Sequence, residues 1–354
     1  MNSLFSQVQV GRYTLSNRVV MAPMTRSRAD DAGVPSKLVA TYYEQRASAG
    51  LIISEGVFPV AQGKGYVRTP GIETDEQVAA WKKVAEAVHL RGGRIFMQLM
   101  HCGRVSHPSM LIDGAQPQAP SAIKAAGQTY TATGLQDFVI PHALSVVEIA
   151  GVVEGYRQAA RRAIEAGFDG VELHAASGYL PEQFLSSGSN QRNDEYGGPV
   201  ENRVRFVLEV LAAMAEEVGG DRVGIKISPE MNFNDIVDAQ PEETYTYLVK
   251  QLQPLNLAYL HVALFGAEFD YHSALRPLFK GSYLVGSGLN KESAEALISG
   301  GKADAAVFGA AFLANPDLPE RLRAGAELNV PDKNTFYAPG AEGYIDYPTL
   351  TQGA

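Results

Sequence analysis

Short apolar runs recur along this chain with helix-like segments between them, and this alternation constrains the fold more than any other feature. Strands that alternate with helices are typical of parallel sheets, because the helix carries the chain back to the start of the next parallel strand. We count eight runs, the number that closes such a sheet into a (β/α)8 TIM barrel of the α/β class. The expected strands are 18–22, 51–55, 94–99, 170–174, 223–227, 258–262, 283–285 and 305–308.

The segment 145–167 carries the clearest helix signal between these strands. Ser145 and Glu148 match a capping box, an apolar stripe follows, and Gly167 can end the helix. The spacer 264–282 is poorly patterned. The other segments expected to be helical are 36–49, 75–92, 200–217, 241–253, 291–300 and 315–325.

The length of 354 residues is ordinary for one barrel, and no linker or low-complexity tract divides the chain. We therefore expect a single domain over residues 1–354. The stretch 101–144 is too long for a barrel loop, and its sequence TYTATGLQDFVI alternates like a hairpin. We interpret it as a capping excursion after the third strand.

Charge and cysteine content narrow the function. A net charge of -9 without any Lys/Arg-rich run argues against nucleic-acid binding and against docking on a membrane, which leaves a small molecule as the expected ligand. The single Cys102 and the absence of a signal-peptide pattern favour the cytoplasm. The seven histidines show no metal-binding spacing, so we expect no metal. Monomer and homodimer both remain open.

Catalytic groups of such barrels lie at the carboxyl ends of the strands, so the strand order also predicts the site. His174, Ser177 and Tyr179 follow the fourth strand in the sequence VELHAASGYL. A neutral imidazole can donate a hydrogen bond to a carbonyl or nitro oxygen, and a tyrosine can give a proton to a carbon next to an anionic centre. His174 and Tyr179 would then polarise and protonate a conjugated substrate. The alternative is a hydrogen-bonded rim histidine beside a packing aromatic.

Two polar residues stand inside apolar strands. Lys226 lies within VGIKISP, where an ammonium group is costly unless it meets an anion, which favours a functional role. Gln98 lies within RIFMQLM, and its amide could contact the edge of a heteroaromatic ring or make a core hydrogen bond to backbone. Met100 and Cys102 are most simply packing residues.

The glycine-containing ends of the last two strands resemble the phosphate cradle that many barrels build there. These are GSGLN (286–290) and FGAAFLANPDL (308–318). The glycine pattern alone is weak evidence. The chain lacks a strand-turn-helix GxGxxG motif, so no dinucleotide-binding domain is expected.

Longer motifs make the chain resemble the Old Yellow Enzyme family, including its N-ethylmaleimide and xenobiotic reductases. They include MAPMTRSRA (21–29), RIFMQLMHCGRVSHP (94–108) and HAASGYLPEQFLSSGSNQRNDEYGGPVENRVRF (174–206). The resemblance covers essentially the whole chain. It implies a barrel that binds FMN, takes hydride from NADPH or NADH, and passes it to the β-carbon of an activated alkene.

The resemblance also implies residue roles. Tyr66 would line the substrate face, His174 would be the first anchor of the substrate's electron-withdrawing group, and Tyr179 would be the proton donor. Lys226 would lie beside the N1/C2 carbonyl edge of the flavin. The other residues implied at the cofactor are Pro23, Thr25, Gly56 and Gln98 around the isoalloxazine ring, with Thr25 tuning the flavin carbonyl, and Ser287, Gly288, Gly309 and Ala310 around the phosphate.

Four positions depart from the family pattern. Ser177 replaces a histidine or asparagine as the second anchor, Lys226 replaces an arginine, and Met100 replaces a tryptophan at the substrate side. Ala310 replaces the arginine that grips the flavin phosphate. Losing a charge-assisted contact costs about 1.5–3 kcal/mol, or roughly ten- to more than a hundredfold in affinity. We therefore expect weak FMN binding.

Two functions remain under consideration. The first is an FMN-dependent ene-reductase acting on a small enone, nitro compound or similar alkene. The second is a redox-neutral descendant of the same barrel, an isomerase, cyclase or lyase that binds FMN weakly or not at all and uses His174 and Tyr179 for acid/base chemistry. A non-catalytic scaffold would be expected to lose the proton donor, and Tyr179 is present.

Overall fold

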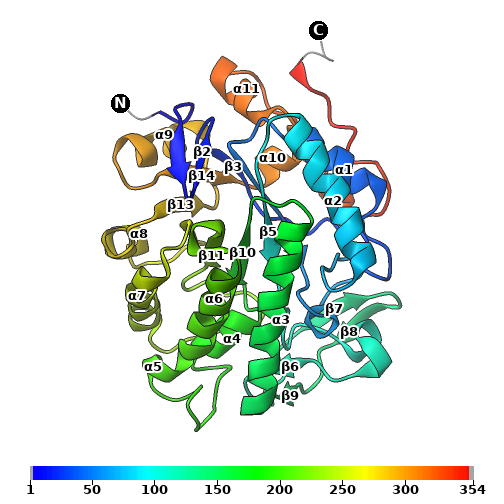
Figure 1. The fold of residues 1–354 in the computed structure, drawn as a ribbon, viewed down its shortest axis with the longest axis vertical. Helices are drawn as coiled ribbons and strands as arrows, with labels where there is room; N and C mark the ends of the chain where they lie inside the picture. The colour runs from blue at the N-terminus through cyan, green and yellow to red at the C-terminus, as the bar shows by residue number, and fades with distance from the viewer. Residues whose placement is uncertain (1–2, 351–354) are drawn as a thin grey trace.

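The computed structural model describes residues 3–350, and its centre is a closed barrel of eight parallel strands (Figure 1). Neighbouring strands follow the order β10-β11-β12-β13-β14-β3-β4-β5, so the barrel closes between β5 and β10. This confirms the expected (β/α)8 barrel. Its strands are β3 (Val19–Met21), β4 (Leu51–Val57), β5 (Ile95–Leu99), β10 (Gly170–Ala175), β11 (Val223–Ile227), β12 (Tyr259–Ala263), β13 (Ser282–Gly286) and β14 (Ala305–Phe308).

Helices surround the barrel. The capping box of Ser145 and Glu148 is present at the start of α3 (Val146–Glu165), and Gly167 follows its end with φ +90°. The poorly patterned spacer contains the short α8 (Tyr271–Leu275), which runs directly into a 3-10 segment. The remaining helices are α1 (Lys37–Glu44), α2 (Asp75–Leu90), α4 (Leu180–Leu185), α5 (Val200–Arg203), α6 (Arg205–Val218), α7 (Pro241–Gln251), α9 (Lys291–Ser299), α10 (Ala310–Ala314) and α11 (Leu318–Ala324).

Short 3-10 segments occur between these elements. They are η1 (Ala61–Gly63), η2 (Pro108–Met110), η3 (Ile112–Gly114), η4 (Gly220–Arg222), η5 (Gln253–Leu255), η6 (Arg276–Leu278) and η7 (Lys333–Thr335). The first helix is shorter than the expected 36–49, since it ends at Glu44.

Alternate residues of the strands point into and out of the barrel. Val171 and Leu173 of β10 belong to the large core shared with the helices. The interior of the barrel toward the amino ends of the strands is filled by a second cluster, which includes Phe96, Tyr259 and Leu284. The hairpin of β1 (Val8–Val10) and β2 (Tyr13–Leu15), which the sequence analysis did not anticipate, packs on this second cluster.

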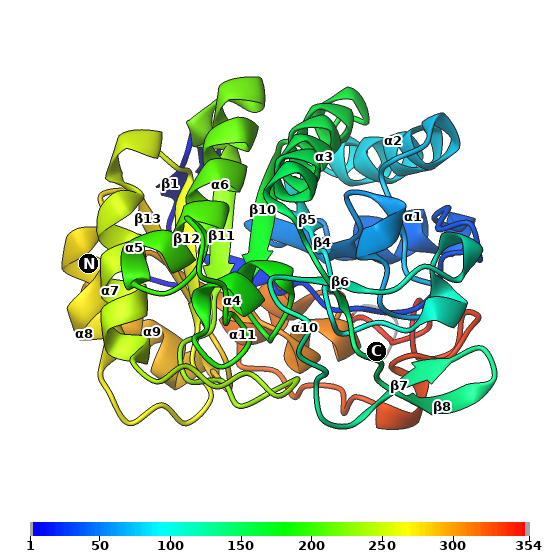
Figure 2. The same cartoon turned by 90° about the horizontal axis from the view of Figure 1, so that it is seen from below.

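The excursion after β5 carries four short strands. They are β6 (Gln118–Ala119), β7 (Gln128–Thr131), β8 (Gly134–Asp137) and β9 (His142–Ala143). The antiparallel pairing of β7 with β8 confirms the expected hairpin, and Ala125 and Phe138 pack in one cluster with Tyr179. Figure 2 shows the hairpin at the same end of the barrel as α4, the helix that follows the carboxyl end of β10. The excursion therefore flanks the predicted site, while the extent of the domain stays a prediction.

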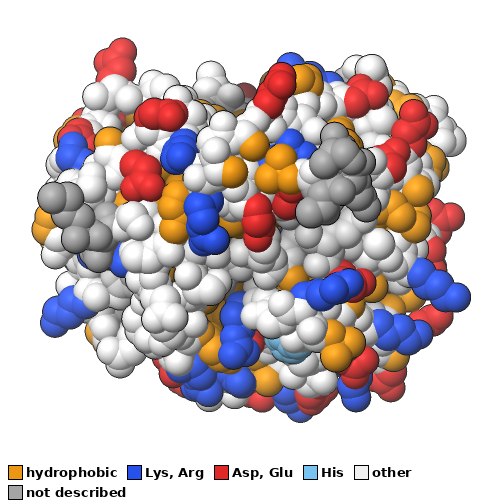
Figure 3. Space-filling view, turned by 90° about the horizontal axis from the view of Figure 1, so that it is seen from above, with side chains coloured by type: hydrophobic (Ala, Val, Ile, Leu, Met, Phe, Trp, Pro, Cys, Tyr) orange, Lys and Arg blue, Asp and Glu red, His pale blue; other side chains and the backbone are white. Residues whose placement is uncertain are grey.

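The described helices and the visible surface bear on possible partners. None of the helices within residues 3–350 is both long enough and apolar enough to span a bilayer. Basic and acidic side chains are interspersed over the face shown in Figure 3. Oligomeric state, location in the cytoplasm and the expected lack of nucleic-acid binding stay predictions.

Candidate active site

Polar side chains occupy the interior of the barrel toward the carboxyl ends of its strands. Strand register pairs His174 of β10 with Lys226 of β11, and Lys226 with His261 of β12. Two residues before His174 in β10, Glu172 pairs with Gln98 of β5. Residues that alternate along a barrel strand share a face, so these five side chains line the same interior.

A buried carboxylate organises this layer. Gln98 Nε2 donates a hydrogen bond of 2.7 Å to Glu172 Oε1, and His261 Nδ1 lies 3.1 Å from Glu172 Oε2. Gln98 is thus held by a side chain rather than by backbone, and its amide orientation is fixed. Sequence reasoning missed Glu172 and His261, although a charged residue in the apolar run GVELHA was a signal of the same kind as Lys226.

Lys226 is half-buried, and among residues 3–350 it has no ion-pair partner. Burial lowers the pKa of its ammonium group, and the more distant Glu172 and Glu182 oppose that shift. A cation without a salt bridge is costly inside a protein. Lys226 is therefore suited to an electron-rich edge of a ligand.

His174 is 5% exposed, and its Nδ1 atom has no hydrogen-bond partner in the described part of the chain. Burial, reinforced by Lys226 and His261, holds the pKa of its imidazole well below the usual value of 6.5. The ring is thus neutral at physiological pH, with one nitrogen left to meet a group that is not part of the protein. This geometry favours the functional interpretation over a hydrogen-bonded rim histidine.

Tyr179 stands beside this imidazole. Its ring meets that of His174 edge-on with 4.8 Å between centroids, and its hydroxyl oxygen lies 2.9 Å from that of Tyr66. Burial raises the pKa of both phenols well above 10. Both hydroxyl groups therefore keep their protons, which a general acid requires.

Ser177 adopts a left-handed backbone with φ +60°. Its hydroxyl lies 3.6 Å from the sulfur of Met231, and no hydrogen bond joins it to His174 within residues 3–350. Its backbone is held by Ser228 Oγ, which accepts from its N–H at 2.9 Å, and by Asn234, which donates to its carbonyl at 2.8 Å. The loop after β11 thus fixes the predicted second anchor.

Met100 packs directly on Gly56. A Cβ atom at Gly56 would lie 2.5 Å from the Met100 sulfur, so any larger residue at position 56 would force the Met100 side chain to move. Pro23 and Thr25 lie half-buried just after β3, the barrel neighbour of β4. Met100 belongs to the same cluster as Tyr179, and Tyr66 packs against that cluster, so two predicted substrate residues lie beside the predicted proton donor.

The residues predicted around a phosphate lie on two adjacent strand ends. Ser287 and Gly288 follow β13 with φ +94° and +63°, and Gly309 and Ala310 follow its neighbour β14. The Ser287 hydroxyl is buried and finds no partner among residues 3–350, and a Cβ at Gly288 would meet open space. A free donor beside two accessible backbones fits a phosphate group. Ala310 is exposed and contributes no charge.

The family comparison agrees with this arrangement. Residues 3–329 match the NADH:flavin oxidoreductase / NADH oxidase family, to which the chain belongs. It is 44% identical over 349 residues to a probable flavin mononucleotide-dependent alkene reductase of Leishmania infantum, covering 96% of each protein. It is 40% identical over 367 residues to 12-oxophytodienoate reductase 2 of Arabidopsis thaliana, covering 99% of this chain and 96% of that protein.

Solved structures show the same relationship. Morphinone reductase in complex with tetrahydroNAD superposes with a TM-score of 0.95 at 50% identity, covering 99% of this chain and 98% of that one. The Old Yellow Enzyme homologue from Zymomonas mobilis also gives a TM-score of 0.95, at 39% identity over 98% of this chain and all of that one. The resemblance drawn from the motifs is therefore confirmed.

Proposed function

We propose that this chain is an FMN-dependent NAD(P)H oxidoreductase that reduces the activated C=C bond of a small enone, nitro compound or similar molecule. The observation that carries the proposal is a protonated Tyr179 in edge contact with a neutral His174 whose Nδ1 has no hydrogen-bond partner in the described part of the chain. An activated alkene needs these two groups: a hydrogen-bond donor for its oxygen and an acid for its carbon. Relatives of the chain are named as alkene and oxophytodienoate reductases.

The residues described above fit FMN. Gln98 and Lys226 would meet the polar edge of the flavin. The Ser287 hydroxyl, which has no partner among the described residues, and the open Gly288 would meet its phosphate. Bound FMN would supply the hydride, which it takes from NADPH or NADH. The other residues we assign to the cofactor are Pro23, Thr25, Gly56, Gly309 and Ala310.

The side chains of this protein supply the rest of the reaction. His174 would donate a hydrogen bond from its imidazole to the substrate oxygen, which draws electron density from the alkene. Tyr179 would deliver a proton to the carbon next to that oxygen-bearing group. Tyr66 and Met100 would line the space in which the substrate lies, since both pack with Tyr179.

One observation favours the redox-neutral alternative. Ala310 lies at the first position of α10, exposed, where it cannot pair with a phosphate. FMN affinity would then depend on Ser287 and on backbone N–H groups. An isomerase, cyclase or lyase that uses His174 and Tyr179 without FMN is the second candidate.

The visible spectrum of the freshly purified protein separates the two. The reductase is supported if protein mixed with excess FMN still shows a flavin absorption band after ultrafiltration has removed the free FMN. Colourless protein that retains no added FMN removes the reductase and leaves the redox-neutral enzyme.

A further inference from the structure

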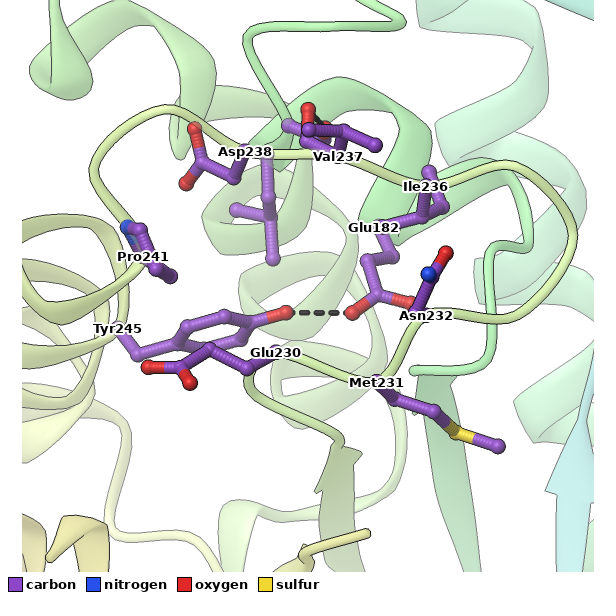
Figure 4. A pocket seen from close by; sticks show the side chains of 11 residues that line it. Glu182, Glu230, Met231, Asn232, Ile236, Val237, Asp238, Pro241 and Tyr245 are labelled. Atoms are coloured by element: carbon purple, nitrogen blue, oxygen red, sulfur yellow. Dashed lines mark hydrogen bonds between the residues drawn. The ribbon is translucent and has the colours of Figure 1, made fainter. Parts of the chain in front are cut away.

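Glu182 is a buried carboxylate that the reaction outlined above does not use. It lies in α4, three residues after Tyr179, and is 1% exposed. It also lines a cavity of about 210 Å³ beneath the loop after β11, together with Glu230, Met231 and Tyr245. Figure 4 shows the Glu182 side chain meeting the Tyr245 hydroxyl from the opposite side of this cavity.

Its two oxygens accept hydrogen bonds from the loop that carries the catalytic groups. The N–H of Gly178 donates to Glu182 Oε2 at 2.6 Å. The Ser228 hydroxyl, which accepts from the N–H of Ser177 at 2.9 Å, lies 3.4 Å from Oε1. Tyr245 donates to the same oxygen at 2.5 Å. Glu182 therefore binds the backbone on the N-terminal side of Tyr179, once directly and once through Ser228.

This backbone needs external support. Ser177 and Gly178 are successive residues with φ +60° and +77°. A left-handed conformation is unfavourable for serine, so it persists only where surrounding contacts hold it. The direction of the Tyr179 side chain depends on these two residues, because they set where the chain enters α4.

We propose that Glu182 is a positioning residue for alkene reduction: its carboxylate holds Ser177 and Gly178 in their left-handed conformation and thereby places the Tyr179 hydroxyl for proton transfer. The inference rests on the proposed ene-reductase function. Glu182 itself touches neither substrate nor cofactor in this scheme.

The ionised form is the one that matches its surroundings, because three donors point at the two oxygens. Burial raises the pKa of the carboxyl group to about 7, partly offset by these hydrogen bonds. The other titratable groups that face it are Lys226 of β11, Asp238 and Glu230 of the following loop, and Tyr245 of α7. Positioning is therefore complete above pH 7 and weakens as pH falls through it.

The parent should show this dependence in alkene reduction. His174 and Tyr179 do not change protonation near pH 7, because their pKa values lie well below 6.5 and well above 10. Rapid mixing of NADPH-reduced, FMN-loaded protein with 2-cyclohexenone should give a rate constant that falls as pH drops from 8 to 6.

Glu182→Gln is the main variant, since it keeps the size but cannot accept from Gly178 and Tyr245 together. We expect alkene reduction to slow by about tenfold and to lose its step near pH 7. Flavin reduction by NADPH and the FMN dissociation constant should stay within about twofold of the parent. Glu182→Asp should restore part of the pH step. Equal losses in both half-reactions, or an unchanged rate and pH profile, would overturn the proposal.

Tyr245→Phe tests the same idea with Glu182 intact. Removing one donor destabilises the carboxylate form, so the step in alkene reduction should move to higher pH. A step that stays in place contradicts the proposal.

Amide hydrogen exchange gives a readout without substrate. The peptide spanning 174–180 should exchange faster in Glu182→Gln than in the parent at the same pH, whereas the peptide from α2 should not. Equal protection of 174–180 in both proteins overturns the positioning role. If Glu182→Gln exchanges faster than the parent at 174–180 but the parent reduces no alkene, the proposed function is refuted and the positioning role of Glu182 on this loop stands.

Discussion

The hydroxyl oxygens of Tyr66 and Tyr179 lie 2.9 Å apart, and burial keeps both phenols protonated. Two consequences follow for proton transfer. Tyr179 has a neighbour that can donate to it after it has lost its own proton, and the pair cannot deprotonate near neutral pH. The pair packs in an apolar cluster with Met100.

Tyr179→Phe should remove the proton donor while leaving the barrel intact. We expect alkene reduction by the reduced enzyme to slow by roughly 10²–10⁴-fold, because a positioned general acid contributes about that much. Flavin reduction by NADPH should be unchanged in rapid-mixing experiments. Tyr66→Phe is the matched control and should have a smaller effect. A Tyr179→Phe protein that reduces 2-cyclohexenone at the parental rate would show that the donor lies elsewhere.

Ala310→Arg should tighten FMN binding, because it adds a cation at the exposed start of α10, which follows the strand next to the one that leads to Ser287 and Gly288. A gain of about tenfold in affinity is expected from one charge-assisted contact partly screened by solvent. Fluorescence titration of apoprotein with FMN measures it. Ala324→Arg, on the exposed end of α11, adds the same charge elsewhere and should leave the affinity unchanged. Equal effects of both substitutions would reduce the result to net charge.

Ser177→Asn should raise both the stability of the protein and its activity on alkenes. Asparagine tolerates the φ of +60° better than serine, and its longer amide extends the reach of the second anchor. We expect a higher melting temperature and faster reduction of maleimide and cyclohexenone probes. Ser177→Gly relieves the backbone without adding an amide, so it should gain stability alone. The anchoring role is refuted if the glycine variant gains as much activity as the asparagine variant.

Glu55, next to Gly56 in β4, gives a pH test of burial. Burial raises the pKa of its carboxyl group from 4.5 to about 7, and its Oε1 has no partner within residues 3–350. A raised pKa means that the folded protein holds this proton more tightly than the unfolded chain does. The protonated carboxyl group therefore contributes its full share to the free energy of unfolding below pH 4.5, and this contribution is lost as pH rises through about 7. Glu55→Gln should therefore gain stability relative to the parent between pH 5 and 8, on the order of 2 kcal/mol. Urea unfolding at both pH values checks it, and a difference independent of pH would contradict it.

The barrel could be predicted because nearly all residues of its strands are buried, so that the strands read as almost continuous apolar runs. The expected strand 223–227 matches β11, and 170–174 falls one residue short of β10. The N-terminal hairpin β1-β2 was not anticipated. Each of its strands has only three residues, too few to show a period.

The candidate site was predictable where chemistry and position coincide. His174 and Lys226 stand out because they are polar residues within apolar strands, and Tyr179 because it follows the end of one. Glu182 does not stand out, since a glutamate in a short helix usually faces solvent, and only the packing of α4 against the loop after β11 buries it. The direction of the Ser177 hydroxyl likewise depends on Met231, which lies 54 residues away.

The most direct test of the central claim is the yield of saturated product. Protein loaded with FMN is incubated without oxygen with NADPH and 2-cyclohexenone, and cyclohexanone is quantified against NADPH consumed. We predict one cyclohexanone per NADPH in the parent and almost none over the same time with Tyr179→Phe. NADPH-independent conversion of the substrate, or no saturated product from protein that retains FMN, would contradict the account.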